Sequence, residues 1–233
     1  MRGHDLLQYK QQAAEQAVTF VESGMVLGLG HGSTTIFAIR LIATLLKAGT
    51  LKDILGIPCS SQVEAEARQL GIPLTTLDKH PVIDVTIDGA DEVDPNLNLI
   101  KGAGGALLRE KIVAQASRRE IIVCDASKLV PVLGTRKALP VEVAPFGWQT
   151  QAAYVAALGA RVDVRANAEG TFFKTDQGNL ILDCAFGPIA DPASLADCLR
   201  ARAGIVEHGL FLGISTDVIC ADAEGIRHLR RHQ

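Results

Sequence analysis

Aromatic residues are scarce in this chain of 233 residues: they make up 4% of it, whereas hydrophobic residues as a whole make up 48%. The core must therefore be built from valine, isoleucine, leucine and alanine. An aliphatic core of this kind is typical of parallel strands covered by helices on both faces. The length allows one large domain or two of modest size.

Cysteine is also sparse, and no C-x-x-C spacing occurs. The odd number and wide spacing of the thiols argue against a disulfide framework and indicate reduced cysteines in a reducing cytosol. The five cysteines are Cys59, Cys124, Cys184, Cys198 and Cys220.

No excess of one charge is present, since the formal net charge is −3. Bulk nucleic-acid binding is therefore not expected, and the arginines near the C-terminus, Arg227, Arg230 and Arg231, are predicted to form a solvated tail. No apolar run approaches the roughly 18 residues that a membrane span requires. Glu15 and Glu22 interrupt the apolar character of the N-terminal segment, so we expect no signal peptide. We expect a cytoplasmic protein with no membrane partner.

Helix-like and strand-like segments alternate over the first 130 residues, which predicts right-handed crossovers and a mostly parallel sheet. The predicted helices are 5–22, 34–47, 61–70 and 107–117, and the predicted strands are 25–30, 54–58, 74–77, 82–87 and 121–124.

The pattern changes after Lys128, where short strands and two helices predict a small α+β unit with its own antiparallel sheet. Strands near Leu210–Leu212 and Asp217–Cys220 are expected to return to the first sheet. The predicted α/β fold therefore has a Rossmann-like domain, 1–131 plus 206–233, and a smaller domain, 132–205. The strands predicted in the smaller domain are 139–143, 161–164, 171–175 and 179–183, and its helices are 149–158 and 195–201.

A glycine loop, GLGHGSTT, lies between a predicted strand and a predicted helix at residues 28–35. Backbone N–H groups at such a junction can hold a phosphate. A Walker A loop is disfavoured because His31-Gly32 precedes Ser33, where a lysine is required. Dinucleotide binding is disfavoured because the second strand ends in Pro58-Cys59-Ser60 without an acid. A small phosphate cup and a simple helix-capping turn remain as alternatives.

The most informative stretch is VTIDGADEVDPNLNLIKGAGGALLREK, residues 85–111. Asp88 and Asp91 follow a strand at the sheet edge where ligands bind. Glu92 and Asp94 are interpreted as solvated acids. A Mg²⁺ site on the aspartates is the less favoured alternative, because Lys101 can supply positive charge instead.

Lys101 begins the glycine loop KGAGG, and Glu110 lies near the start of the helix that follows. Glycines let the backbone approach a ligand closely, and an acid at a helix N-terminus can face a pocket at that loop. Carboxylates, a lysine and backbone N–H groups together suit proton transfer on a small anionic molecule.

Taken in order, these segments resemble the A type of ribose-5-phosphate isomerase over nearly the whole chain. GHGST resembles the family's GTGST phosphate loop, and IDGADEVD and KGAGGALLREK resemble its DGADE and KGGGAALxREK segments. VCDASK, LPVEV and GNLILD match further signatures, as does the closing GLFLG and DVIC region.

The resemblance implies a Rossmann-like domain with a ferredoxin-like α+β domain, assembled as a homodimer or homotetramer. It implies aldose–ketose interconversion of D-ribose 5-phosphate and D-ribulose 5-phosphate in the non-oxidative pentose phosphate pathway, with no metal or organic cofactor. Catalysis is expected from Glu110 as the general base with Asp88 and Lys101. The expected substrate contacts are Lys10, Gly32, Ser33, Thr34, Thr35, Asp88, Asp91, Lys101, Gly102 and Lys128.

Two residues depart from the family pattern: His31 replaces a threonine, and Leu108 replaces a polar residue. His31 is interpreted as supporting the backbone turn. A sugar-phosphate deaminase, a CoA transferase and a non-catalytic sugar-phosphate sensor are the alternative functions. Against them, no CoA groove and no residues for a DNA-binding module are evident.

Overall fold

The computed structural model describes residues 3–231, and their contacts divide the chain into two compact units. Unit 1 takes the residues up to Ala90, Arg109–Lys128 and those from Gly213 onward. Unit 2 takes Asp91–Leu108 and Leu129–Leu212. The chain therefore passes between the two units four times.

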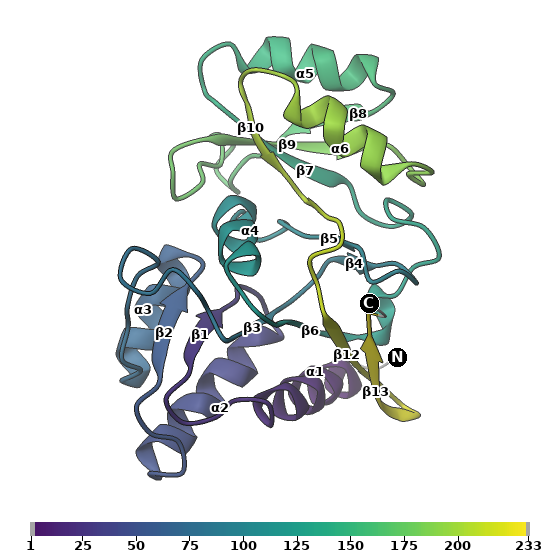
Figure 1. Ribbon diagram of the computed structural model, residues 1–233. Helices are drawn as coiled ribbons and strands as arrows, with labels where there is room; N and C mark the ends of the chain where they lie inside the picture. Colours follow the sequence, from purple (N-terminus) through teal and green to yellow (C-terminus); the bar gives the residue numbers. More distant parts are fainter. Residues whose placement is uncertain (1–2, 232–233) are drawn as a thin grey trace. The chain divides into compact units, whose positions relative to one another are not determined.

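Unit 1 is built on a six-stranded sheet in the order β13-β12-β6-β3-β1-β2, in which only β13 is antiparallel to its neighbour (Figure 1). Among the parallel strands this is the 2-1-3-4-5 order of doubly wound folds, whose ligands bind where the order reverses, between β1 and β3. The strands are β1 (Val26–Leu29), β2 (Leu55–Pro58), β3 (Val85–Asp88), β6 (Glu120–Asp125), β12 (Asp217–Asp222) and β13 (Gly225–Arg230).

Helices cover both faces of this sheet, as expected for parallel strands that are buried on both sides. On one face α1 and α2 pack together, and their alanines and isoleucines join Leu27 and Leu29 of β1 in one core cluster (Figure 1). On the opposite face Val113 of α4 packs with Ile57 and Ile83. The helices are α1 (Gly3–Val18), α2 (Thr35–Lys47), α3 (Ser61–Leu70) and α4 (Leu107–Gln115), with the 3-10 helix η1 (Ala126–Lys128) after β6.

Unit 2 holds a four-stranded antiparallel sheet in the order β10-β7-β9-β8 and a three-stranded sheet in the order β11-β5-β4. The chain order β7-α5-β8-β9-α6-β10 together with that strand order is the ferredoxin-like arrangement. The strands are β4 (Glu92–Val93), β5 (Leu99–Ile100), β7 (Leu139–Val143), β8 (Arg161–Val164), β9 (Leu180–Ala185), β10 (Ile205–His208) and β11 (Leu210–Phe211), and the helices are α5 (Trp148–Ala157) and α6 (Pro192–Arg200).

The predicted α/β class with a mostly parallel sheet and a separate antiparallel sheet is confirmed. Two predicted strands are wrong. Residues 74–77 and 171–175 make single bridges only, Gly56 with Leu74 and Ala166 with Phe172. The first segment stops pairing because a turn follows, in which His80 N donates to Thr76 O.

The strand near Leu210 does not return to the first sheet, because β11 pairs with β5. That pairing also groups residues 91–108 with unit 2, whereas the sequence placed them with the Rossmann-like part. The predicted domain boundaries at 131/132 and 205/206 therefore differ from the observed contact units, and independent folding of either part stays a prediction.

Two predictions about charged residues are also wrong. Arg227 and Arg230 are exposed to solvent as predicted, but they lie in the edge strand β13 rather than in a tail, and Arg227 pairs with Asp222. Glu92 is fully buried, because its carboxylate accepts N–H groups from Gly134, Arg136 and Lys137.

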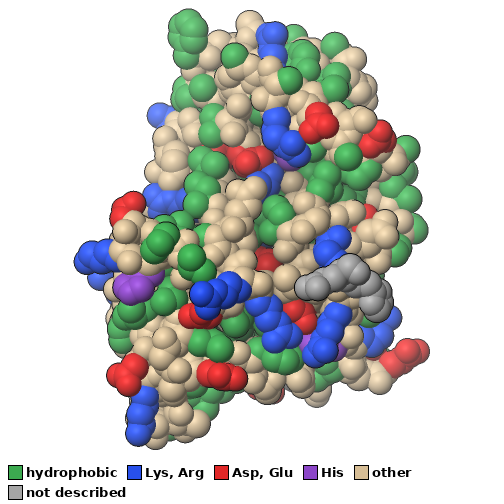
Figure 2. All heavy atoms as spheres, viewed as in Figure 1, with side chains coloured by type: hydrophobic (Ala, Val, Ile, Leu, Met, Phe, Trp, Pro, Cys, Tyr) green, Lys and Arg blue, Asp and Glu red, His purple; other side chains and the backbone are tan. Residues whose placement is uncertain are grey.

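Within the described residues, no helix combines the length and apolar character needed to cross a membrane. The face shown in Figure 2 intersperses basic, acidic and apolar side chains.

Candidate active site

A column of two glycines on β1 and just after it sets the geometry of the site in unit 1. Gly28 and Gly30 face α4, since Leu27 and Leu29 point to the opposite core and side chains alternate along a strand. A Cβ at Gly28 would lie 2.8 Å from Val113 Cγ1, and one at Gly30 would lie 2.5 Å from Asp88 Cα. The absence of both side chains therefore leaves room for Thr86 of β3 and Val113 of α4 beside Gly28, and for Asp88 beside Gly30.

Asp88 is held in a fixed orientation at the carboxyl end of β3. Its Oδ1 accepts the backbone N–H of Gly89 at 2.7 Å and that of His31 at 3.0 Å, and its side chain is buried. The bond from His31 ties Asp88 to the loop after β1. Asp88 therefore stands at the β1/β3 switch point that the strand order predicts as the ligand site.

Glu110 reaches the same place from α4. It precedes Val113 by three residues, so the two lie on one helix face, and Val113 packs over the glycine column. Glu110 is 4% exposed and Asp88 1% exposed. One oxygen of each carboxylate and Sγ of Cys59 lie within 4.8 Å of one another. The structure thus brings together two of the three predicted catalytic residues.

Cys59 was not predicted to belong to the site. Its N–H donates to Leu29 O at 3.1 Å, which places it across β1 from Asp88 with Gly30 between them. The sequence shows that Cys59 follows directly after the predicted strand that ends at Pro58. Its position next to Glu110 depends on how α4 packs, which the sequence does not show. Among the described residues, Cys59, Asp88 and Glu110 are the set whose donor atoms could hold a metal ion.

The predicted phosphate loop follows β1 and lines a cavity of about 310 Å³. Gly32 has φ +147, a conformation that favours glycine, and Thr35 Oγ1 donates to Gly32 O at 2.9 Å. Lys10 Nζ donates to Ser33 Oγ at 2.9 Å, so α1 contributes a cation to this loop. Thr34 precedes α2 without a side-chain cap, so the capping alternative does not explain it.

His31 lines this cavity and also ties the loop to its neighbours. Its ring Nδ1 lies 2.9 Å from Ser60 Oγ, and Ser60 Oγ also accepts the N–H of Val63 as the N-cap of α3. The loop, the start of α3 and Asp88 are therefore joined through one residue. This agrees with the interpretation of His31 as a support of the backbone turn.

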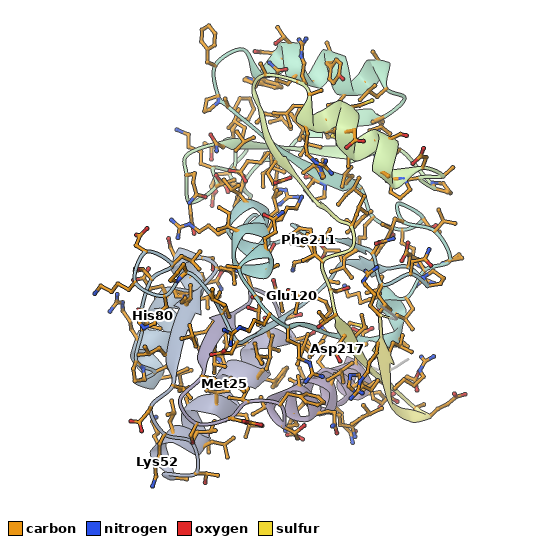
Figure 3. The ribbon with its side chains drawn as sticks, viewed as in Figure 1. Met25, Lys52, His80, Glu120, Phe211 and Asp217 are labelled. Atoms are coloured by element: carbon orange, nitrogen blue, oxygen red, sulfur yellow. The ribbon has the colours of Figure 1, made fainter. Side chains whose placement is uncertain are left out.

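In unit 2, Asp91 and Lys101 belong to one loop system. Asp91 Oδ2 accepts the N–H of Ala103 at 2.9 Å, which fastens the acidic turn to the KGAGG loop. Lys101 is 2% exposed, and its Nζ lies 5.5 Å from the centre of the ring of Phe211. Phe211 is labelled in Figure 3. Gly102 has φ +107, so this turn needs a glycine there. Asp91 thus shapes the loop.

Arg165 also shapes this loop and was missed by the sequence interpretation. Its guanidinium donates to the carbonyl oxygens of Gly102 and Ala103, and it forms an ion pair with Asp183 on β9. These contacts hold the loop against the ferredoxin-like sheet of unit 2. No local pattern marks such a residue, because Gly102 and Ala103 lie about sixty positions earlier in the chain and Asp183 lies 18 positions later.

Lys128 ends η1 at the carboxyl end of β6 and is half-buried in unit 1. Asp125 orders this turn, because its Oδ1 accepts the N–H of Ser127 at 3.0 Å.

A larger cavity of about 580 Å³ lies elsewhere in unit 1 and is lined by Ile57, Arg68 and Arg109. The carboxylates of Asp88 and Glu110 do not line it.

Comparison with known proteins bears on this arrangement. The family described as ribose 5-phosphate isomerase A (phosphoriboisomerase A) matches residues 55–225. A protein named ribose-5-phosphate isomerase A from Chloroflexus aurantiacus is 59% identical over 94% of this chain and 92% of its own length.

Solved structures are similar as well. A D-ribose-5-phosphate isomerase in complex with phospho-erythronic acid has a TM-score of 0.95 and 40% identity, covering 97% of this chain and 99% of that one. The ribose 5-phosphate isomerase of Plasmodium falciparum has a TM-score of 0.95 and 41% identity, covering 98% and 100%.

Proposed function

The chain belongs to the ribose 5-phosphate isomerase A family, and on that premise we propose that it interconverts D-ribose 5-phosphate and D-ribulose 5-phosphate with Glu110 as the base. The observation that carries the proposal is the buried pair of carboxylates, Asp88 and Glu110, gathered at the β1/β3 switch point beside the glycine loop. The isomerase needs no redox partner, since hydrogen moves within one substrate.

Glu110 takes the proton from C2 of the open-chain sugar and returns it to C1 through a cis-enediolate. A single carboxylate on one face of the substrate suffices for both steps. Its position on α4, one turn before the packed Val113, supports this role because a rigid helix fixes the base.

The negative charge that develops on the substrate oxygens requires positive charge and N–H donors. We assign the charge to Lys101, and Gly102 is proposed to bring backbone N–H groups close. The burial of Lys101 supports the assignment, because an ammonium removed from water interacts more strongly with an anion. Asp91 is proposed to orient hydroxyls while it holds the loop.

Asp88 is proposed to shuttle the proton during ring opening, since its carboxylate lies beside that of Glu110. The phosphate is proposed to bind at the loop 30–35, where Lys10 meets Ser33. The backbone N–H of Gly32 and the hydroxyl of Thr34 are proposed to complete the cup, with Thr35 releasing its bond to Gly32 O when its hydroxyl turns to the phosphate, and Lys128 is proposed as a second cation. Fixing the phosphate sets the register of C1 and C2 against Glu110.

A direct assay tests this function. Purified protein is given ribose 5-phosphate, and ribulose 5-phosphate is quantified over time. Phospho-erythronic acid, which carries a carboxylate where the enediolate carries its oxygens, is expected to inhibit competitively. Failure to produce ribulose 5-phosphate would overturn this proposal, and release of ammonia from glucosamine 6-phosphate would favour the deaminase in its place.

The assembly and compartment are also proposals. We propose a homodimer or homotetramer in the cytoplasm, acting in the non-oxidative pentose phosphate pathway. The free state of all five cysteines supports a reducing compartment. Light scattering coupled to size-exclusion chromatography tests the assembly, and a monomer at micromolar concentration would contradict it.

A further inference from the structure

Cys59 has no part in the proposed reaction, yet its thiol lies among the groups that carry it out. The residue is fully buried directly after β2. Its Sγ, a carboxylate oxygen of Asp88 and one of Glu110 are mutually within 4.8 Å. A sulfur and two carboxylate oxygens are a mixed donor set, not only an acidic cluster.

We propose that Cys59, Asp88 and Glu110 form a binding site for one thiophilic divalent cation, such as Zn²⁺ or Cd²⁺, and that its occupation inhibits the enzyme. Zn²⁺ takes three protein ligands plus a water at open sites, with metal–ligand distances of roughly 2.0–2.3 Å. Ligand atoms around such an ion are about 3.5 Å apart. Separations of up to 4.8 Å therefore need a closure of at most roughly 1.3 Å to reach such a geometry.

Local structure prepares two of the donors. The missing side chain of Gly30 lets Cys59 and Asp88 face each other across β1, and two backbone N–H groups already hold Asp88 in place. Two buried carboxylates this close repel each other, and a cation between them removes that repulsion. When the metal–sulfur bond forms, the S–H bond of Cys59 breaks and its proton is released to solvent.

The thiol determines which ion is selected. Mg²⁺ prefers oxygen ligands in octahedral geometry and retains its waters, so one sulfur in a confined set disfavours it. Zn²⁺, Cd²⁺ and Co²⁺ accept thiolate. Inhibition follows because the ion occupies the carboxylates of Glu110 and Asp88. This last step rests on the proposed function, whereas metal binding does not.

Binding is tested without reference to activity. Chelator-stripped full-length protein is titrated with Co²⁺, and a thiolate-to-cobalt charge-transfer band is expected to saturate at one ion per chain. The band is expected to disappear in Cys59→Ser and in Cys59→Ala, and to persist in Cys198→Ser, the matched variant of an exposed thiol. Absence of the band in the wild type, or its persistence in Cys59→Ser, overturns the proposal.

A second measurement uses only the wild-type protein, so it remains informative if the Cys59 variants fail to fold. Zinc-edge X-ray absorption is expected to show one sulfur ligand with oxygen ligands. Cys124 and Cys220 are a rival site, since they pair in register on β6 and β12. A shell with two sulfurs, or with none, therefore contradicts the assignment to Cys59.

Activity tests the consequence. Zn²⁺ is expected to inhibit isomerisation in the wild type, with reversal by EDTA and no inhibition by Mg²⁺. Loss of a group that supports a metal ligand typically weakens metal binding roughly 10–100-fold. Half-inhibition of Cys59→Ser is therefore expected to require a Zn²⁺ concentration higher by at least that factor. Equal sensitivity of Cys59→Ser and wild type overturns the inhibitory role. If the protein does not isomerise ribose 5-phosphate but still gives the cobalt band, the proposed function is overturned and the metal site is retained.

Discussion

Two glutamates of this chain, Glu92 and Glu110, lie in different environments because they contact different partners. Glu92 and Glu110 are both buried. Glu92 accepts three backbone N–H groups from the loop 134–137 and so holds unit 2 together. Glu110 lies beside Asp88 and Cys59 at the sheet edge of unit 1. Residue type and local spacing do not distinguish these two environments.

Replacing Glu110 by glutamine is expected to leave substrate binding intact and to lower kcat by roughly two to four orders of magnitude, the scale of general-base catalysis. Steady-state kinetics with ribose 5-phosphate measures the effect. Glu224→Gln, at an exposed turn, is the matched control and should keep wild-type kcat. Near-normal turnover of Glu110→Gln would remove the base from the mechanism.

Asp217 at the start of β12 gives a pH-dependent stability (Figure 3). Burial favours a higher pKa, but hydrogen bonds from Arg119, Thr216 and His228 outweigh it and hold the pKa of Asp217 well below its usual range. A lowered pKa contributes stability above the unfolded value, about 3.9, which is lost as the pH falls toward the folded value. Asp217 therefore stabilises the protein at neutral pH and not in strong acid.

We expect Asp217→Asn to lower the free energy of unfolding at pH 7 by about 1–3 kcal/mol, the range for hydrogen bonds to a charged group. The difference from wild type should shrink as the pH falls below about 4. Urea unfolding at several pH values measures it, with the exposed Asp197→Asn as control. A difference that is constant with pH would contradict the role of the charge.

At the scale of elements, the site is a junction of the carboxyl ends of β1 and β3, the loop after β1 and helix α4. The glycine column lets α4 lie close to β1, and α4 carries Glu110 on the face that contacts the sheet. The loop after β1 is fixed by His31, which bonds to both Asp88 and the N-cap residue Ser60. The loop and Asp88 are therefore linked directly through the backbone N–H of His31.

Gly30→Ala tests this junction. The added methyl group would lie 2.5 Å from Cα and Cγ of Asp88, so Asp88 must move. We expect a loss of about 1–3 kcal/mol in the free energy of unfolding, typical of overpacking, together with reduced kcat. Gly89→Ala is the steric control, since the nearest contact of its Cβ is at 3.8 Å. Equal stability of the two variants would contradict the argument.

At the scale of the molecule, the two units divide the predicted catalytic groups. Asp88, Glu110 and the phosphate loop lie in unit 1, and Asp91 and Lys101 lie in unit 2. The chain crosses between the units within helix α4, just before Glu110. The sequence interpretation placed all these groups in one domain. The pairing of β5 with β11, which joins residues 91–108 to unit 2, leaves no pattern in the sequence.

A reaction that uses carboxylates and Lys101 needs no metal ion. Activity is therefore expected to survive exhaustive dialysis against EDTA, measured with ribose 5-phosphate in chelator-treated buffers. Loss of activity with recovery on adding Mg²⁺ or Mn²⁺ would restore the metal alternative for Asp88 and Asp91. Full activity in EDTA is also the baseline for the zinc inhibition proposed above.

The sequence by itself determined the parallel and antiparallel parts, the helices α3 and α2 nearly to their ends, and the glycine and acidic motifs. These depend on periodicity, caps and turn residues that act within a few positions. Only the tertiary structure decided that β11 pairs with β5, that Glu92 is buried and that Cys59 meets Asp88 and Glu110. Each of these needs partners more than twenty residues away, and packing against such partners leaves no local pattern.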